Sequence, residues 1–251
     1  MAALFASALL CATAFAGNIY IDPTGEDWRD GTTQARAVKT IGEGLRKANG
    51  GDTVHLQGKY YKEHVVFPKS GANGNRIILD GEGATIEGPD SLYVWGGVLQ
   101  MQGKSYVTIK RCNINKSKWF GIAVLEWSNN IIIDDNDTKD TFASGIYVNS
   151  AWGIDIKNNV VDNACYGNDT TVPHVQECIS VGRTSGFTIS SNEVKNNWAT
   201  HFRGGEGIDA KEGSSNGTIN NNTVHDLIKL GIYVDSYNAE QNNITVRNNT
   251  V

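Results

Sequence analysis

The sequence lacks the features of several large classes of protein. It has no run of about 18 uncharged apolar residues, which a membrane-spanning helix requires. Only 20% of its 251 residues are charged, too few for a charged disordered chain. Lys and Arg number 22 against 27 Asp and Glu, so the formal net charge is −5 and nucleic acid is not an expected partner. Four cysteines are too few for a disulfide-based scaffold.

Several short functional motifs are missing as well. The sequence has no glycine-rich phosphate-binding loop, no Cys-x-x-Cys pair and no His-Glu-x-x-His motif. A nucleotide cofactor and a zinc ion are therefore not expected.

The first residues have the pattern of an export signal. Residues 2–15 form an uncharged run rich in Ala and Leu, and Ala14-Phe15-Ala16 before Gly17 matches the small-x-small pattern of signal-peptide cleavage. We therefore predict a signal peptide over residues 1–16, cleavage after Ala16, and a secreted or periplasmic protein.

A helical pattern follows in residues 38–48. Val38, Ile41, Leu45 and Ala48 are apolar and recur at helical spacing. The segments around this stretch are short, alternate apolar with polar residues and end in turns rich in Gly. The pattern predicts one short amphipathic helix among β-strands.

From about Val98 onward the chain repeats itself. Elements that resemble Gly-Ile-x-Val begin at residues 121, 145, 178, 207 and 231, at spacings of 24, 33, 29 and 24 residues. Hydrophobic strand residues recur at Ile109, Ile133, Ile156, Ile189, Ile219 and Val246, and three residues after each stand Cys112, Asn136, Asn159, Asn192, Asn222 and Asn249. A period of about 20 to 30 residues without a helix pattern indicates a solenoid of short strands.

The asparagine content follows from such an architecture. The chain holds 26 Asn, of which 22 lie from Asn113 onward. Coils that stack about 4.8 Å apart place equivalent side chains in ladders. We expect each ladder Asn to adopt left-handed backbone angles at a bend and to hydrogen-bond the Asn of the next coil. An antiparallel β-sandwich is the alternative, but it would not require the same residue at the same place in every turn.

The Asn-rich coils, together with the segment AVKTIGEGLRKANGGDTVHLQGKYY, carry a family resemblance. They resemble the right-handed parallel β-helix proteins of the pectate lyase-like superfamily. The resemblance implies an all-β fold, a single right-handed parallel β-helix over residues 17–251, with residues 38–48 as a helix that caps its N-terminal end. We expect a monomer. Because Val251 falls on an interior position of the repeat, we also expect a longer parent chain with further coils.

Charged residues gather on the outward side of three successive coils. Alignment of the repeats puts Glu177 and Glu206 in one ladder, and the period of two along a strand turns Asp209 and Lys211 outward beside them. The resulting face holds Glu177, Glu206, Asp209, Lys211, Asp235 and Arg183. Stacked carboxylates repel each other, so their presence indicates a compensating cation, either a basic side chain or a metal ion. A purely structural network of ion pairs is the alternative.

Two reactions suit this face. In a polysaccharide lyase, carboxylates bind Ca²⁺, the ion neutralises a uronate carboxylate, and Lys211 or Arg183 with a lowered pKa removes the proton at C5. In a glycoside hydrolase, two carboxylates such as Glu177 and Asp209 act as acid and as nucleophile or base. A carbohydrate-binding or adhesion module without catalytic activity is the third possibility.

Two further resemblances concern the site. The segment GGEGIDAKEGSSNGTINNNTVHDLIKLGIYVD resembles the Ca²⁺-dependent pectate lyases of polysaccharide lyase family nine, which implies Glu206 and Asp235 as calcium ligands, joined by Glu177. The paired acids that this family carries one coil later are absent here. The elements ECISV and GIDAKEG also resemble β-helix glycosidases of the xylosidase type, which implies Glu177 and Asp209 as the catalytic pair.

The sequence thus predicts an enzyme that acts on a polysaccharide, in the first place a Ca²⁺-assisted lyase. Its candidate catalytic residues are Lys211, Asp209, Glu177 and Arg183. Tyr233 on the same face, and His201 and Arg203 in an insertion between coils, are expected to contact the substrate.

Overall fold

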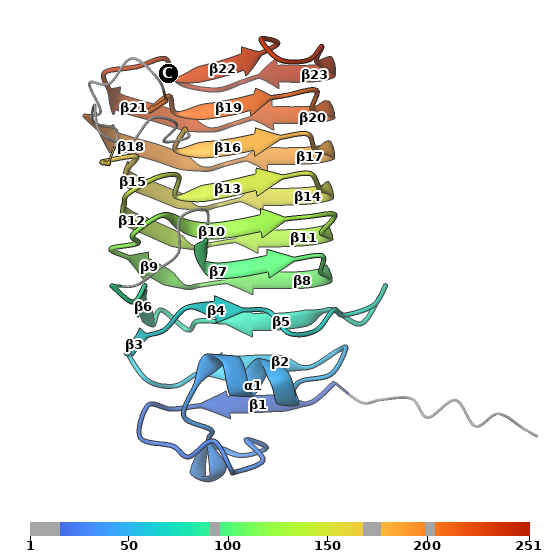
Figure 1. Cartoon of the computed structure of the whole chain (residues 1–251), viewed down its shortest axis with the longest axis vertical. Helices are drawn as coiled ribbons and strands as arrows, with labels where there is room; N and C mark the ends of the chain where they lie inside the picture. Colours follow the sequence, from blue (N-terminus) through green and yellow to red (C-terminus); the bar gives the residue numbers. More distant parts are fainter. Residues whose placement is uncertain (1–15, 91–95, 168–176, 199–203) are drawn as a thin grey trace, which may run out of the picture.

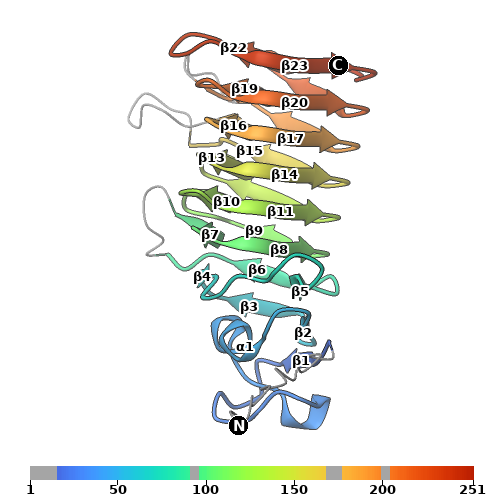
Figure 2. The same ribbon diagram turned by 90° about the vertical axis from the view of Figure 1, so that its right-hand side faces the viewer.

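The protein is a stack of coils built from three parallel β-sheets (Figures 1 and 2). A computed structural model describes residues 16–90, 96–167, 177–198 and 204–251. Most coils contribute one strand to each sheet, and the strands that neighbour each other within a sheet are parallel. The all-β parallel solenoid predicted from the repeat is therefore confirmed. Nearly all of the predicted signal peptide, residues 1–15, lies outside the described residues.

The three sheets contain nine, seven and seven strands. The first sheet consists of β1 (Asn18–Ile21), β2 (Thr53–Leu56), β5 (Ile77–Asp80), β8 (Ser105–Lys110), β11 (Asn129–Asp134), β14 (Trp152–Lys157), β17 (Ser185–Ser190), β20 (Ser215–Asn220) and β23 (Asn242–Arg247). The second sheet consists of β4 (Val65–Val66), β7 (Gly97–Gln102), β10 (Phe120–Leu125), β13 (Ile146–Asn149), β16 (Ile179–Gly182), β19 (Ile208–Lys211) and β22 (Ile232–Asp235). The third sheet consists of β3 (Tyr60–Lys62), β6 (Thr85–Glu87), β9 (Asn113–Asn115), β12 (Asp137–Thr141), β15 (Val160–Ala164), β18 (Glu193–Asn197) and β21 (Thr223–Leu227).

Aliphatic ladders fill the interior of the solenoid. Ile133 pairs with Ile109 on the preceding coil and with Ile156 on the next, and the row continues through Ile189 and Ile219. All five side chains are fully buried. Burial of such side chains is the main source of stability in a fold whose coils contact only their neighbours.

The asparagine ladder is also present. Asn192 donates its side-chain amide to Asn222 Oδ1 at 3.0 Å, and its own Oδ1 accepts the amide of Asn159 at 2.9 Å. The prediction that Asn192 and Asn222 stack on adjacent coils is confirmed. The expectation of left-handed angles at the ladder Asn residues is wrong, because the preceding residues adopt them, as Asn158 and Asn221 do with φ of 56°. The bend is made one residue earlier, which leaves the ladder side chain pointing inward.

The N-terminal helix is shorter than the spacing predicts. Helix α1 spans Ile41–Lys47, and Thr40 caps it by accepting a hydrogen bond from the Glu43 amide. Val38 does not join the helix, because its backbone is bonded to the strand residue Tyr20 and to Asp22. Among the described residues, no helix is long and apolar enough to cross a membrane.

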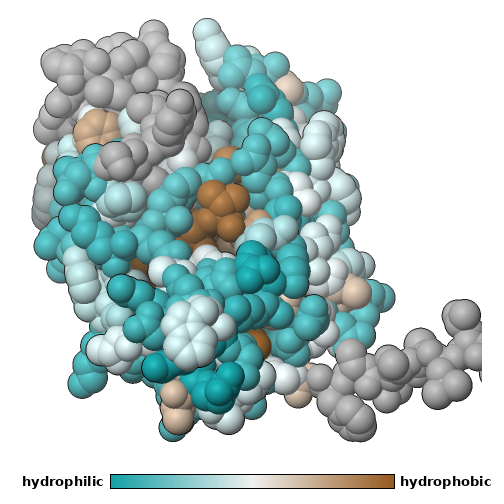
Figure 3. All heavy atoms as spheres, turned by 60° about the horizontal axis from the view of Figure 1, so that its bottom comes forward, coloured by the Kyte–Doolittle hydropathy of each residue, from teal (hydrophilic) through white to brown (hydrophobic). Residues whose placement is uncertain are grey.

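The predicted capping role of this helix is not confirmed. Figure 1 shows α1 beside the first coils, with the segment that joins β1 to α1 lying beyond it at this end. The helix contacts β1, β2 and β4, which are the strands at this end of the first and second sheets. The surface at this end is mostly hydrophilic (Figure 3).

Candidate active site

The second sheet presents the outward side chains that the sequence predicted to converge. Asp209 on β19 pairs with Ser180 on the preceding coil and with Tyr233 on the following coil. The predicted outward rows are therefore confirmed in these coils. The two rows hold Tyr147, Ser180, Asp209 and Tyr233, and Asn149, Gly182, Lys211 and Asp235.

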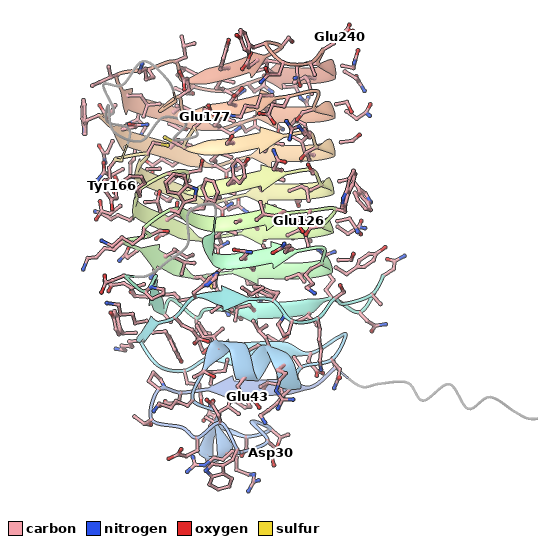
Figure 4. All side chains as sticks on the ribbon, viewed as in Figure 1. Asp30, Glu43, Glu126, Tyr166, Glu177 and Glu240 are labelled. Atoms are coloured by element: carbon pink, nitrogen blue, oxygen red, sulfur yellow. The ribbon has the colours of Figure 1, made fainter. Side chains whose placement is uncertain are left out.

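Lys211 joins two carboxylates from adjacent coils. Its Nζ atom donates to Glu177 Oε2 at 2.5 Å and lies 3.9 Å from Asp209 Oδ2. Ser180 donates its hydroxyl to the same Glu177 oxygen at 2.7 Å. Glu177, which is labelled in Figure 4, precedes β16 by two residues and lies one coil before Asp209 and Lys211. We call Glu177, Lys211 and Asp209 the acid–lysine cluster.

The cluster is buried although its strands lie on the outside of the solenoid. Exposed fractions are 7% for Glu177, 9% for Lys211 and 1% for Asp209. Because this ion pair is removed from water, replacing one partner would leave the charge of the other buried and unpaired. Such an arrangement contrasts with the exposed ion pairs that contribute little on most protein surfaces.

The cluster keeps Lys211 in its charged form. Burial lowers the pKa of Lys211, but the charge and hydrogen bond of Glu177, with the charge of Asp209, outweigh it, and the pKa is raised. A basic residue that removes a proton, the role predicted for Lys211, needs a lowered pKa. The structure gives Lys211 the opposite shift, which suits an electrostatic role.

Asp209 is held in its neutral form. Burial, followed by the negative charge of Glu177, raises the pKa of Asp209 to about 8, against the opposing charge of Lys211. Its Oδ1 atom is buried and has no hydrogen-bond partner among the described residues. At neutral pH Asp209 therefore carries a proton that it can donate.

Replacing Asp209 with Asn is expected to raise the thermal stability of the chain at pH 8. The pKa is about 8 in the fold and about 3.9 in the unfolded chain, so the folded state binds more protons across this window. The native protein therefore loses stability as the pH rises from about 4 to about 8, and the Asp209→Asn variant would not. Thermal unfolding from pH 4 to pH 9 checks this. A difference between the two proteins that does not grow with pH would contradict it.

Arg183 lies beside the cluster and pairs elsewhere. Its Nη2 atom lies 3.3 Å from Glu212 Oε2, and its side chain is 61% exposed. Both residues have left-handed angles, with φ of 48° and 56°, in the turns that follow β16 and β19. Asn149 donates to the same Glu212 oxygen at 3.5 Å. The guanidinium is thus exposed to solvent while it is paired with Glu212.

The predicted calcium ligands do not form a three-residue cluster. In the part of the chain that is described, Glu177, Glu206 and Asp235 do not bring one carboxylate oxygen each into a set that lies within 4.8 Å. Asp235 Oδ1 instead accepts the backbone amide of Tyr237 at 2.7 Å in the turn after β22. Glu206 is partly buried, and burial raises its pKa.

The predicted substrate-contacting residues divide into two groups. Tyr233 is 39% exposed in the row that contains Asp209, and the nearby charge of Asp235 raises its pKa. His201 and Arg203 lie outside the described residues.

Two residues of the site were missed as functional candidates. Ser180 holds Glu177, and Tyr147 lies one coil before Ser180, stacked on Phe120 with ring centroids 4.2 Å apart. Both occupy the same outward row as Asp209. Membership of that row was the signal that could have identified them.

These features place the chain in a defined class, the right-handed parallel β-helix proteins. The family model described as "Right handed beta helix region" matches residues 69–202 and 96–251, and the chain belongs to this family. No curated protein matches the chain.

Solved structures with the same fold are distant in sequence. An alginate lyase from Paenibacillus sp. str. FPU-7 is 20% identical with a TM-score of 0.65, over 83% of this chain and 72% of its own. XylC, in a complex with xylose, is 9% identical with a TM-score of 0.54, over 92% and 70%. A rhamnogalacturonan lyase is 14% identical with a TM-score of 0.52, over 94% and 63%. At these identities the similarity concerns the fold.

Proposed function

We propose that the protein cleaves a polysaccharide and that Asp209 and Glu177 are its acid–base pair. The observation that carries this proposal is the acid–lysine cluster, in which one ammonium lies within 4 Å of both carboxylates. Burial keeps Asp209 protonated, whereas Glu177 is paired with the cation. A carboxyl group with a raised pKa and a second one that accepts a hydrogen bond from an ammonium are suited to acid and base roles.

The reaction that suits this face best is β-elimination on a uronate polymer. Glu177 takes the proton from C5, the electron pair forms the double bond between C4 and C5, and the bond from C4 to O4 breaks. Asp209 gives its proton to the departing O4. Lys211 and the guanidinium of Arg183 supply positive charge for the substrate carboxylate and for the charge that develops beside it. Two of the solved structures with this fold are named as lyases, of alginate and of rhamnogalacturonan.

Glycoside hydrolysis is the second candidate, favoured by the same pair of carboxylates. Retaining glycosidases place two carboxyl groups about 5 Å apart, one protonated and one ionised. Glu177 and Asp209 contact one ammonium from adjacent coils, which is compatible with that arrangement. A β-helix protein of this fold was solved with xylose.

Calcium stays a prediction of the resemblance, and no step above depends on it. The described residues do not fit the implied site, because Lys211 already supplies the cation at Glu177 and the three predicted ligands do not converge. A chelator is therefore expected to leave the rate unchanged. A loss of activity that added Ca²⁺ restores would reinstate Glu206 and Asp235 as ligands.

Incubation with alginate, pectate and xylan tests the proposal. A lyase releases unsaturated products that absorb ultraviolet light, and this is the expected result with one of the uronate polymers. New reducing ends without that absorbance would favour the hydrolase. Binding to the polymers without either product would favour a carbohydrate-binding module and overturn the catalytic proposal.

A further inference from the structure

Asp52 is a buried carboxylate at the N-terminal end of the solenoid. It is 8% exposed, directly before β2, and its two oxygens accept the backbone amides of Gly17 at 2.7 Å and Asn49 at 2.8 Å. It has no ion-pair partner among the described residues. A buried carboxylate without a cation is unusual, because removing its charge from water is costly.

The cations of the neighbouring segments are engaged elsewhere. Lys69 donates its ammonium to the Ala48 carbonyl at 2.9 Å, and Arg76 donates to Thr108 Oγ1 at 2.8 Å. Lys47 on α1 pairs with Glu43 at 2.7 Å. Among the described residues, the donor to Asp52 Oδ1 is the nitrogen of Gly17.

That nitrogen is the atom which the predicted cleavage would charge. Ala14-Phe15-Ala16 has the small-x-small pattern, and hydrolysis of the Ala16–Gly17 bond consumes one water, leaves a carboxylate on Ala16 and frees an ammonium group on Gly17. Position 17 also favours glycine, because a Cβ atom there would lie 2.9 Å from Asp52 Oδ1. The predicted cleavage would therefore charge the same nitrogen that donates to Asp52 Oδ1.

We propose that removal of the leader creates an ion pair between the Gly17 α-ammonium and Asp52 that fastens the first strand to the solenoid. Gly17 directly precedes β1, the edge strand of the first sheet, and its carbonyl accepts the Thr53 amide at 3.0 Å. Chain ends fray unless they are tied down. A charged hydrogen bond to a buried carboxylate is roughly twice as strong as a neutral one. This inference is independent of the acid–lysine cluster.

The first test is the identity of the mature N-terminus. The full chain is expressed in a host that exports it, and the intact mass and N-terminal sequence are measured. The expected product begins at Gly17. A product that keeps its leader, or begins at another residue, would overturn the proposal.

The second test separates the new ion pair from the turn that Asp52 also supports. Asp52→Asn is introduced into the exported chain and into the full chain made without export, which keeps residues 1–16. The substitution is expected to lower Tm by about 2 to 4 °C more in the exported chain. An equal shift in both would assign Asp52 to the turn alone and overturn the ion pair.

A pH profile gives a third readout. An α-amino group has a pKa of about 8 in an unfolded chain, and Asp52 would raise it in the fold. The stabilisation is thus present below about pH 8 and is lost as the pH rises through the raised pKa. The neighbouring elements carry further titratable or charged groups: Tyr20 on β1, Glu43, Arg46 and Lys47 on α1, His55 on β2, Asp80 on β5, and Lys69 and Arg76 between β4 and β5. They are common to both chains, so the extra loss is expected only in the exported chain with Asp52; its absence there would contradict the ion pair.

Discussion

Replacing Glu177 with Gln is expected to lower the turnover of the polysaccharide that the protein cleaves by about 10²- to 10⁴-fold. Gln preserves the size of the side chain and can still accept the Ser180 hydroxyl, but it cannot take a proton from the sugar or pair with Lys211. The loss is expected in kcat, because the proton is transferred in the chemical step. Initial rates of product formation over a range of substrate concentrations measure it.

Glu193→Gln is a matched control for this experiment. Glu193 also pairs with a lysine, with its Oε2 atom 2.7 Å from Lys195 Nζ. It belongs to β18 in the third sheet and is partly exposed. Its replacement is expected to leave the rate unchanged. Equal losses in the two variants, or an unchanged rate with Glu177→Gln, would remove Glu177 from the chemistry.

The coil register could be predicted because a parallel solenoid converts spacing in the sequence into position in space. Residues that occupy the same place in successive repeats, such as Ile156 and Ile189, become direct neighbours. The helix boundary could not be predicted in this way. Val38 has the spacing of a helical residue, but its backbone hydrogen bonds with Tyr20 and Asp22 depend on a contact that the local pattern does not contain.

The coil positions of the site residues could be predicted from the sequence, but their side-chain contacts could not. The register brought Glu177, Asp209 and Lys211 onto adjacent coils, and this part of the prediction is confirmed. Which carboxylate Lys211 binds depends on side-chain rotamers, and the repeat spacing does not determine them. The raised pKa of Lys211 depends on that choice, since pairing with Glu177 outweighs the effect of burial. The contact of Asp235 could not be predicted for the same reason. Its carboxylate was predicted to bind a metal ion, and in the structure it accepts the backbone amide of Tyr237 in its own turn.

Replacing Asn192 with Leu is expected to destabilise the chain by about 3 kcal/mol or more. Leu has a similar shape, but it leaves the backbone amide of Asn159 without its acceptor, Asn192 Oδ1. The side-chain amide of Asn159 loses the same acceptor and keeps those at the Ile133 and Lys157 carbonyls. The Ile156 carbonyl also loses the donor that lies 3.0 Å away. These groups are buried, and each unsatisfied group costs about 1 to 3 kcal/mol.

Asn242→Ala is the control, because Asn242 is exposed on β23 and its replacement is expected to change stability by less than about 0.5 kcal/mol. Chemical denaturation of the two variants and the native chain measures both effects. Since each coil contacts only its neighbours, the loss at Asn192 is expected to open the coils on either side of β17 first. Hydrogen exchange would detect this as faster exchange at the amides of Asn159 and Asn192 than at those of the Ile109 coil. An equal loss of hydrogen-exchange protection over the whole solenoid would contradict this local opening and show that the ladder acts on global stability alone.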